Sequence, residues 1–321
     1  GGTLGHINPM LPVVKKIKDN YQLIFIGTKT GLEKQLIEDT NIFNQEYYLD
    51  MQGLKRRISI KNIKTLIKYF KCKREARDIL KDIKPDLVVG MGGYISGVVI
   101  KAALSLHLKT IIHEQNAVIG LANKLVYKKV DRFLLGLPLA KSIKQKNVVY
   151  VGNPRLTEIY ENNQDHIEEK KLIVVVGGSR GSTVINEVIF AAKDELIKKG
   201  YQIILITGKK YYEEHDIPKD SENFKIISFT NQLIELMKKA SLVISRSGAT
   251  TLSEILGLRK ISILIPSPNV TNNHQEKNAD VLVKNKCAIM IKENELTKEL
   301  LVKQIERLND RDFRFHMLLN M

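Results

Sequence analysis

The sequence predicts an α/β protein made of two doubly wound domains, each a parallel sheet covered by helices on both faces. Short apolar runs without alternation, such as 172–176, are separated by amphipathic segments, which is typical of buried parallel strands joined by helices. The pattern Gly-Gly-hydroxyl-x-Gly occurs at 1–5 and again at 177–181, and each copy opens a series of such units. A chain of 321 residues is also long for one domain.

The N-terminal half is expected to form a Rossmann-like domain over residues 1–155. Pro9 suits the first turn of a helix, where its missing N–H costs little. The segment 1–5 reads as the turn that follows a strand, so the first N-terminal strand of this domain is expected to be missing. A second glycine turn is expected at 92–97. Expected strands are 21–27, 85–90, 110–115, 132–136 and 148–152, and expected helices are 8–18, 32–39, 60–84, 98–106 and 121–129.

The C-terminal half is expected to form the second domain over residues 156–321. Residues 153–171 contain Pro154 and polar residues without apolar periodicity, which predicts a linker. Ligands of doubly wound sheets bind at the carboxyl ends of the strands, so two such domains would face each other across a cleft. Expected strands are 172–176, 202–207, 224–229, 242–246, 261–266 and 288–291, and expected helices are 183–199, 233–240, 250–257, 275–285 and 297–309.

Composition excludes several classes of protein. No apolar run approaches the roughly 20 residues of a transmembrane helix, and the first residues do not form a secretory signal. Cys72 and Cys287 give neither a disulfide framework nor a metal-binding spacing, which fits a reducing compartment. The net charge of +16 favours an acidic partner: a nucleic acid, an anionic membrane or a polyanionic substrate.

The segment 245–254, Ser-Arg-Ser-Gly-Ala-Thr-Thr-Leu-Ser-Glu, passes from a buried strand to the start of a helix. Free backbone N–H groups and the helix dipole make such a point suitable for an anion. Thr250 and Thr251 add hydroxyl donors, and Glu254 could accept hydrogen bonds from sugar hydroxyls. A phosphate and a sugar together suggest a nucleotide, and an ordinary capped strand-loop-helix unit explains the pattern equally well.

The glycine loops do not match the common nucleotide-binding motifs. No Gly-Lys-Ser/Thr follows them, so they are not Walker A loops, and the first lacks the Gly-x-Gly-x-x-Gly spacing of dinucleotide binders. The sequence therefore argues against an NAD enzyme. Each loop taken alone is as well explained by a tight strand-to-helix turn.

Polar side chains follow the glycine loops and strands at three places. His6 lies where a helix begins after the first glycine loop and could act as a general base. The four polar residues 113–116 end a strand and suggest a cleft. The amides within 272–278 suit sugar hydroxyls better than proton transfer. Capping, packing or a solvated loop are the structural alternatives for each.

Residues 54–81 contain 11 lysines and arginines and two acidic residues. Ile60, Ile63, Ile67 and Phe70 fall at helical spacing among them. An apolar stripe with basic flanks suits an interfacial helix on an anionic membrane, while a packed helix with a solvated basic face is the alternative. No nucleic-acid-binding module is recognisable, and no nucleic-acid partner is expected.

The ordered set of motifs resembles the MurG family, the UDP-N-acetylglucosamine:undecaprenyl-pyrophosphoryl-muramoyl-pentapeptide N-acetylglucosaminyltransferases of peptidoglycan synthesis. The resemblance covers nearly the whole chain and implies a glycosyltransferase B fold. It places the lipid acceptor on residues 1–155 and the UDP-sugar on residues 156–321, with the last helix packing back on the first domain. The motifs are 1–6, 92–97, 113–116, 152–154, 177–181, 246–254 and 274–279.

The resemblance also implies site residues on both domains, with no metal and no cofactor. Those on the donor side are Ser179 and Thr251 at the diphosphate, Ala249 and Thr250 near the phosphate and sugar, Glu254 at the ribose, Gln275 and Asn278 at the GlcNAc hydroxyls, and Phe229 and Thr230 beside the uracil. Those on the acceptor side are Thr3, Gly5, His6, Tyr94 and Asn116, of which His6, Tyr94 and Asn116 form the catalytic set and His6 is the candidate base.

This sequence departs from the family pattern at three positions. Val98 follows Gly97 where the family usually has proline, and Leu4 replaces a usual glycine. Arg155 comes one residue earlier than the family's arginine, so it is given no role.

The reaction that the resemblance implies is an inverting, metal-independent transfer of GlcNAc from UDP-GlcNAc to the C4 hydroxyl of the muramoyl unit of lipid I, giving lipid II. The enzyme would be peripheral on the cytoplasmic face of the bacterial cell membrane. The alternatives are a UDP-GlcNAc epimerase or glycolipid synthase of the same fold, and a non-catalytic basic adaptor that binds a membrane or nucleic acid.

Overall fold

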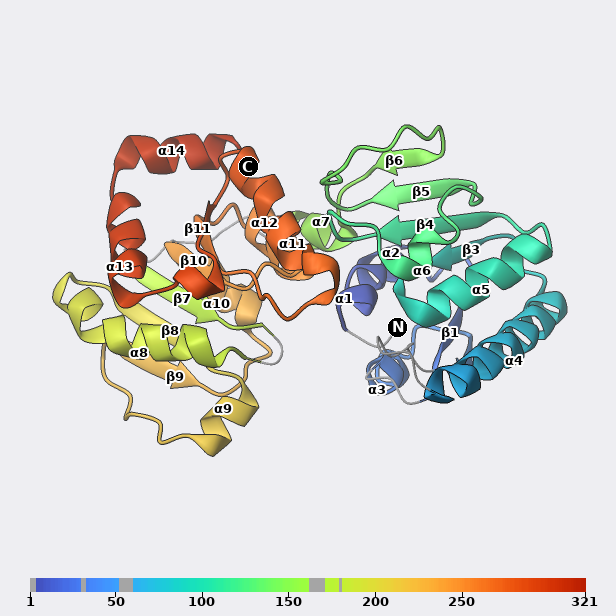
Figure 1. Cartoon of the computed structure of the whole chain (residues 1–321), viewed down its shortest axis with the longest axis horizontal. Helices are drawn as coiled ribbons and strands as arrows, with labels where there is room; N and C mark the ends of the chain where they lie inside the picture. The colour runs from blue at the N-terminus through green and yellow to red at the C-terminus, as the bar shows by residue number, and fades with distance from the viewer. Residues whose placement is uncertain (1–3, 30–32, 52–59, 162–170, 179–180) are drawn as a thin grey trace. The chain divides into compact units, whose positions relative to one another are not determined.

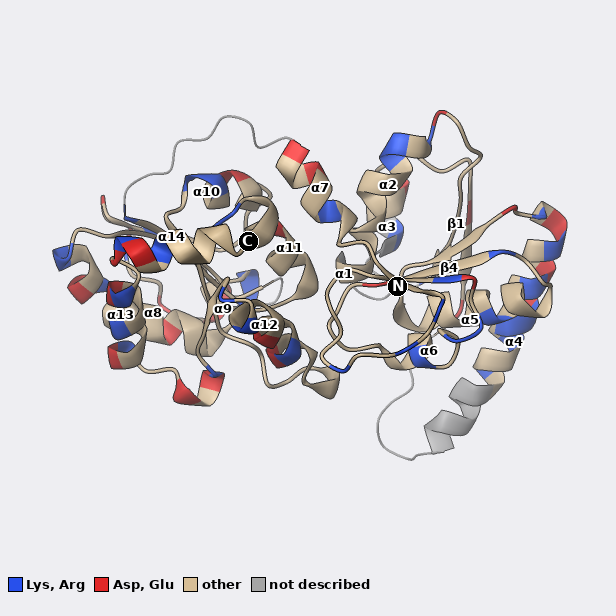
Figure 2. Ribbon diagram, turned by 90° about the horizontal axis from the view of Figure 1, so that it is seen from above, with Lys and Arg blue, Asp and Glu red and all other residues tan. Residues whose placement is uncertain are grey.

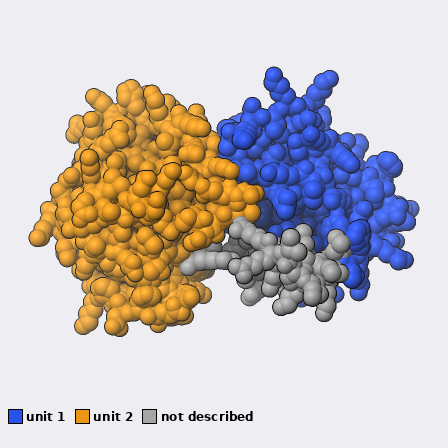
Figure 3. Space-filling view, viewed as in Figure 1, with its two compact units in different colours: residues 1–155 blue, residues 156–321 orange. Residues whose placement is uncertain are grey.

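The computed structural model describes residues 4–29, 33–51, 60–161, 171–178 and 181–321. The chain folds as two compact units, unit 1 with residues 1–155 and unit 2 with residues 156–321 (Figure 3). All strand pairs in both sheets of unit 1 and in the sheet of unit 2 are parallel among the described residues. The predicted class of two Rossmann-like α/β domains is confirmed.

The described strands of unit 1 form two sheets, one of β1 and β2 and one in the order β3-β4-β5-β6 (Figure 1). Helix α5 packs on the larger sheet, and Ile100, Ile112 and Phe133 are fully buried between them. The strands are β1 Ile24–Thr28, β2 Gln45–Leu49, β3 Val88–Gly90, β4 Thr110–Glu114, β5 Arg132–Leu135 and β6 Val148–Tyr150. The helices are α1 Leu4–Ile7, α2 Met10–Ile17, α3 Glu33–Glu38, α4 Ile60–Ile83, α5 Gly93–Ser105 and α6 Leu121–Lys124.

Unit 1 differs from the sequence-based expectation at its glycine turns. A turn was expected at 1–5, but Leu4 and Gly5 already belong to helix α1. The helix expected from residue 8 begins at Met10, because Pro9 has no N–H to continue the ladder of α1. The second glycine turn is also helical from Gly93 onward. Strand β2 was not predicted, because its residues are polar or half-buried and give no apolar run.

Unit 2 has one sheet, whose described strands run in the order β12-β11-β10-β7-β8-β9. All five residues of β7 are buried, because helices cover both faces of the sheet. The strands are β7 Leu172–Val176, β8 Gln202–Ile206, β9 Phe224–Ile227, β10 Leu242–Ser245, β11 Ser262–Leu264 and β12 Ile289–Met290. The helices are α7 Pro154–Glu161, which begins in unit 1, α8 Thr183–Lys198, α9 Lys209–Glu214, α10 Leu233–Lys239, α11 Ala249–Gly257, α12 His274–Lys284, α13 Lys298–Arg307 and α14 Arg311–Leu319, with short 3₁₀ helices η1 Thr271–Asn273 and η2 Glu293–Glu295.

Three helices at the edges of this pattern were not predicted. The segment expected to be a linker contains α7, whose Ile159 is buried against Gly257 of α11. Helix α14 begins after Asp310, whose side chain caps it by accepting from two backbone N–H groups. Its single buried residue, Met317, leaves too weak an apolar pattern for a prediction. Helix α9 is short and has no buried residue.

Two observations bear on membrane and redox chemistry. Among the described residues, no helix combines the length and the apolarity that crossing a membrane requires. Cys72 and Cys287 are buried thiols without a disulfide partner.

Candidate active site

The sheet of unit 2 has a topological switch point between β7 and β10. The chain continues from β7 to β8 on one side of β7, while β10 lies on its other side, and ligands of doubly wound sheets bind at such a point. Ser245 is in register with Val176, and the backbone N of Arg246 donates to the Val176 carbonyl over 3.3 Å. Helices α8 and α11 therefore begin at the same edge of the sheet, the edge formed by the carboxyl ends of its strands. Their free N–H groups and dipoles suit an anion there.

Glycines allow the turn after β7 to pass close to its neighbours. Gly181 has φ of +74°, and a Cβ there would lie 2.3 Å from the carbonyl oxygen of Thr207. A Cβ at Gly177 would lie 2.5 Å from the backbone N of Ser182. Neither space admits a side chain, so the N-terminus of α8 packs closely on the end of β8, where Asn186 Nδ2 also donates to the Thr207 carbonyl over 3.0 Å.

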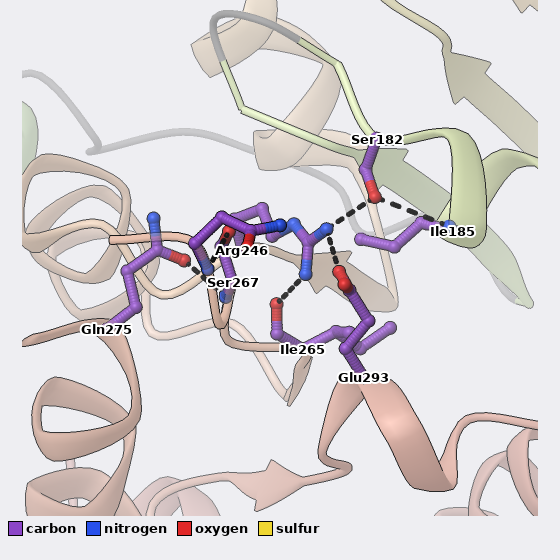
Figure 4. A network of polar contacts seen from close by, with 8 residues as sticks. Ser182, Ile185, Arg246, Ile265, Ser267, Gln275 and Glu293 are labelled. Carbon is purple, nitrogen blue, oxygen red and sulfur yellow. Dashed lines mark hydrogen bonds and ion pairs between the residues drawn. The ribbon is translucent and has the colours of Figure 1, made fainter. Parts of the chain in front are cut away.

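Arg246, which follows β10, contacts the segments that follow β7, β11 and β12 (Figure 4). Its guanidinium donates to Ser182 Oγ over 2.6 Å and to the Ile265 carbonyl over 3.1 Å, and it forms an ion pair with Glu293. Ser182 Oγ in turn accepts from the backbone N of Ile185 and caps α8. The guanidinium therefore lies at the N-terminus of α8. Neither Arg246 nor Glu293 was predicted from the sequence to have a role at the site.

The amide residues of α12 bind the loops that follow β10 and β11. Ser247 Oγ donates to the Gln275 carbonyl over 2.8 Å, and Asn278 Nδ2 donates to the Ser247 carbonyl over 3.2 Å. The backbone N of Ser267 donates to Gln275 Oε1 over 2.8 Å (Figure 4). Asn278 is fully buried and Gln275 half-buried. Both predicted residues thus shape the loops, and their contact with a sugar stays a prediction.

The other predicted donor residues lie on unit 2 around the same edge. Glu254 is in the second turn of α11 and is 7% exposed. Phe229 follows β9 and is 52% exposed, with Lys209 Nζ 5.1 Å from its ring centre. Thr230 Oγ accepts from the backbone N of Gln232 over 2.9 Å. The first turn of α11 contains buried Ala249 and half-buried Thr250 and Thr251, whereas Ser179 lies outside the described residues.

In unit 1, the carboxylate of Glu114 at the end of β4 organises the loop that follows. Oε1 accepts from the backbone N and from Nδ2 of Asn116, both over 3.2 Å. Oε2 accepts from the backbone N of Gly120 over 2.8 Å and from Asn123 Nδ2 over 2.9 Å. Glu114 and Asn123 are both buried. Asn116 is therefore a positioned amide, and Glu114 is the residue that positions it.

His113 and Gln115 extend this network to the segments that follow β6 and β3. His113 Nε2 lies 2.9 Å from the Gly152 carbonyl, and Gln115 Nε2 donates to the Met91 carbonyl over 2.9 Å. Burial of the imidazole lowers the pKa of His113 below its ordinary value of 6.5. The segment 113–116 was expected to line a cleft, but His113, Glu114 and Gln115 are buried and only Asn116 is partly exposed.

His6 lies against the second glycine segment. A Cβ at Gly92, which has φ of +91°, would be 2.8 Å from His6 Cδ2, 3.2 Å from His6 Nε2 and 3.7 Å from Asn123 Nδ2. The structure thus brings His6 of α1 close to the network of Glu114. Tyr94 lies in the first turn of α5 and is exposed. Gly5 is exposed in α1, and Thr3 lies outside the described residues.

Helix α4 contains the described part of the basic segment 54–81; residues 54–59 lie outside the described residues. Lysine and arginine residues occur along the coloured part of α4 (Figure 2). Cys72, Ala76 and Leu80 are buried against unit 1, while Ile67 and Phe70 are 65% and 61% exposed. The helix is thus packed on one face and presents exposed apolar residues elsewhere. Helix α4 is continuous over Ile60–Ile83, close to the helix expected at 60–84.

No group of three or more histidine, cysteine, aspartate or glutamate side chains suited to a metal ion occurs in the described part of the chain.

Comparison with known proteins identifies the family. The chain matches the glycosyltransferase family 28 N-terminal domain over residues 1–135 and the C-terminal domain of that family over residues 172–317. It is 38% identical over 323 residues to the UDP-N-acetylglucosamine--N-acetylmuramyl-(pentapeptide) pyrophosphoryl-undecaprenol N-acetylglucosamine transferase of Bacillus licheniformis, with 96% of this chain and 88% of that protein covered. The chain belongs to the MurG family. The Bacillus subtilis enzyme of the same name is 37% identical, with the same coverage.

Solved structures agree with membership of the MurG family. The crystal structure of Acinetobacter baumannii MurG superposes with a TM-score of 0.77 at 27% identity, covering 98% of this chain and 91% of that one. A UDP-N-acetylglucosamine 2-epimerase gives a TM-score of 0.65 at 13% identity, covering 98% and 86%. The second similarity shows only that the fold is shared.

Proposed function

We propose that this chain transfers GlcNAc from UDP-GlcNAc to the muramoyl unit of undecaprenyl-pyrophosphoryl-MurNAc-pentapeptide, which converts lipid I to lipid II. Family membership supports this reaction, because the relatives at 37–38% identity are named for it. The structural observation that carries the proposal is the meeting of the N-termini of α8 and α11 at the switch point of unit 2. This arrangement suits the diphosphate of a nucleotide sugar.

The chemistry is a displacement at C1 of GlcNAc. The C4 hydroxyl of the muramoyl unit attacks C1, the bond from C1 to the β-phosphate oxygen breaks, and UDP leaves with inversion at C1. Negative charge grows on the diphosphate as it leaves. Helix N-terminal N–H groups and nearby hydroxyls, including those of Thr250 and Thr251, stabilise that charge where it develops.

The donor contacts proposed on unit 2 are those that the resemblance to the MurG family implies, and the positions of the described residues among them support the proposal. Ser179 and Thr251 bind the diphosphate, and Glu254 in the next turn of α11 accepts from the ribose hydroxyls. Phe229 is exposed enough to cover the uracil face. Gln275 offers its side-chain Nε2 to the GlcNAc hydroxyls, since its Oε1 is occupied by Ser267.

Unit 1 supplies the acceptor side in this proposal, together with the base. His6 takes the proton from the C4 hydroxyl, and Asn116 and Tyr94 orient the acceptor. The position of His6 against Gly92, next to the amide of Asn123, supports a role at this end of the sheet. Glu114 fixes Asn116 by two hydrogen bonds and so keeps its amide oriented before the acceptor binds.

The acceptor is a membrane lipid, so the enzyme has to work at a membrane surface. We propose that it is peripheral on the cytoplasmic face and binds anionic lipid through the basic segment 54–81. The exposed Ile67 and Phe70 of α4 support this, because they lie three residues apart on one side of a helix rich in lysine and arginine.

The decisive experiment measures UDP release from UDP-GlcNAc with and without a soluble lipid I analogue. Release that depends on the analogue, with GlcNAc found attached to it, is the expected result. Conversion of UDP-GlcNAc to an epimeric UDP-sugar without an acceptor, and with no net release of UDP, would instead indicate an epimerase of the same fold. Failure to bind UDP-GlcNAc in isothermal titration would contradict every nucleotide-sugar reaction and favour a non-catalytic adaptor.

A further inference from the structure

Two neighbouring residues of opposite charge fix the short helix η2 to the edge of unit 2 where α8 and α11 begin and where the UDP-sugar donor is proposed to bind. Lys292 Nζ lies 3.0 Å from a carboxylate oxygen of Glu276 at the start of α12. The carboxylate of Glu293 forms an ion pair with Arg246 at the end of β10. One turn of chain therefore binds both the segment that presents Gln275 and the segment that leads into α11.

The pair of Arg246 and Glu293 is not an ordinary surface salt bridge. The two side chains are only 11% and 16% exposed, so solvent screens their attraction far less than it screens a surface pair. The nitrogen Nη2 that contacts Glu293 also donates to Ser182 Oγ over 2.6 Å. The carboxylate of Glu293 therefore lies two hydrogen bonds from the capping residue of α8, at the helix end that favours an anion.

We propose that Glu293 is a positioning residue of the donor site. It holds the guanidinium of Arg246 against the N-terminus of α8 and offsets its positive charge until the diphosphate of the donor arrives. This rests on the proposed function, because it assumes that the diphosphate binds at the edge formed by α8 and α11. Glu293 thus acts through Arg246 and need not touch the substrate.

The proposal makes opposite predictions for two substitutions. Glu293→Gln keeps the size of the side chain and an oxygen that accepts from Nη2, but it removes the negative charge. The site then becomes more positive with its geometry kept, so UDP should bind about three- to tenfold more tightly. Glu293→Ala removes the hydrogen bond as well and releases the guanidinium, so UDP should bind more weakly than to the wild type.

The matched control is Glu295→Gln in the same 3₁₀ helix. Glu295 is exposed, and its substitution removes the same negative charge, but Glu295 makes no ion pair with Arg246. UDP affinity is measured by isothermal titration on the full chain for the wild type and all three variants. The expected order of affinity is Glu293→Gln first, then wild type and Glu295→Gln together, then Glu293→Ala.

Turnover gives a second, independent measurement. Tighter binding of the leaving UDP should lower the Michaelis constant for UDP-GlcNAc in Glu293→Gln and make UDP a stronger inhibitor. A UDP affinity of Glu293→Gln equal to that of Glu295→Gln, or weaker than that of the wild type, would overturn the role of Glu293 and leave the proposed function intact. A wild-type chain that binds no UDP would overturn both. If Glu293→Ala does not fold, the near-isosteric Glu293→Gln still decides between these results.

Discussion

Glu114 and Asn116 are joined by two hydrogen bonds to the same carboxylate oxygen, from the backbone N and from Nδ2 of the asparagine, each 3.2 Å long. The other oxygen accepts from Gly120 and Asn123. The loop after β4 is thus ordered by the buried carboxylate of Glu114. From the sequence, Glu114 was recognised only as one of the polar residues 113–116, with no role of its own.

Glu114→Gln should lower both stability and turnover. The new amide presents N–H groups to donors that had an acceptor, so the free energy of unfolding should fall by about 2 to 4 kcal/mol. Asn116 loses its fixed orientation, so turnover should fall further than the Michaelis constant for UDP-GlcNAc changes. Chemical denaturation and steady-state kinetics measure the two effects. The exposed Glu75→Gln on α4 is the control, and equal behaviour of both variants would contradict the role of Glu114.

Gly181→Ala should disrupt the turn after β7. A Cβ there would lie 2.3 Å from the Thr207 carbonyl oxygen, in addition to the strain at φ of +74°. Gly200→Ala is the control in the same unit, since Gly200 has φ of +82° and its nearest neighbour would be 3.5 Å away, at the end of the Lys171 side chain. The control should lose about 1 to 2 kcal/mol. Gly181→Ala should lose more and should also raise the Michaelis constant for UDP-GlcNAc. Equal losses of unfolding free energy in Gly181→Ala and Gly200→Ala would mean that the turn after β7 can shift to admit the new Cβ.

The turn after β7 and the pair of Arg246 and Glu293 show which features of unit 2 the sequence could predict and which it could not. The glycine spacing at 177–181 and the buried run of β7 are local patterns, so they predicted the strand, the turn and the start of α8. The pair of Arg246 and Glu293 joins residues 47 positions apart. Their contact depends on the strand order of the sheet, which brings β10 and the end of β12 to one edge. No periodicity in the sequence records that order.

The same limit applies in unit 1. The polar residues 113–116 were recognised because they follow an apolar strand. Their burial could not be predicted, because the acceptors of His113 and Gln115 are carbonyls of Gly152 and Met91, in the segments that follow β6 and β3. Strand β2 was missed for a related reason: it lies at an edge, with four of its five residues exposed or partly exposed, and so lacks an apolar run.

His113 should make stability depend on pH. Burial lowers its pKa below 6.5 in the folded chain, whereas in the unfolded chain it titrates near that value. The stabilisation is therefore complete above about pH 6.5 and is lost as pH falls through the lowered pKa, by at most about 1.4 kcal/mol per pH unit. Unfolding free energies from about pH 7.5 to about pH 5.5 should fall more steeply for the wild type than for His113→Gln. The exposed His316→Gln should keep the wild-type slope; a wild-type slope in His113→Gln would contradict the assignment.

Ile67 and Phe70 should contribute to membrane binding. Both are exposed on α4 near its lysines and arginines, and transfer of two large apolar side chains into a lipid interface is worth at least about tenfold in partitioning. Ile67→Ser with Phe70→Ser should reduce co-sedimentation with vesicles that contain anionic lipid. Phe315→Ser on α14 removes an equally exposed ring from unit 2 and serves as the control. Unchanged binding of the double variant would show that this face does not contact the membrane.

Glu254→Gln should weaken the donor side alone. Glu254 is buried in the second turn of α11, behind the helix N-terminus proposed to bind the diphosphate, and its carboxylate is the proposed acceptor for the ribose hydroxyls. Losing that charged acceptor should raise the Michaelis constant for UDP-GlcNAc about tenfold, while the constant for the lipid I analogue stays unchanged. The exposed Glu222→Gln is the control, and thermal denaturation shows whether the buried substitution is tolerated. An effect confined to use of the acceptor would move Glu254 away from the donor and require a different orientation of the nucleotide on unit 2.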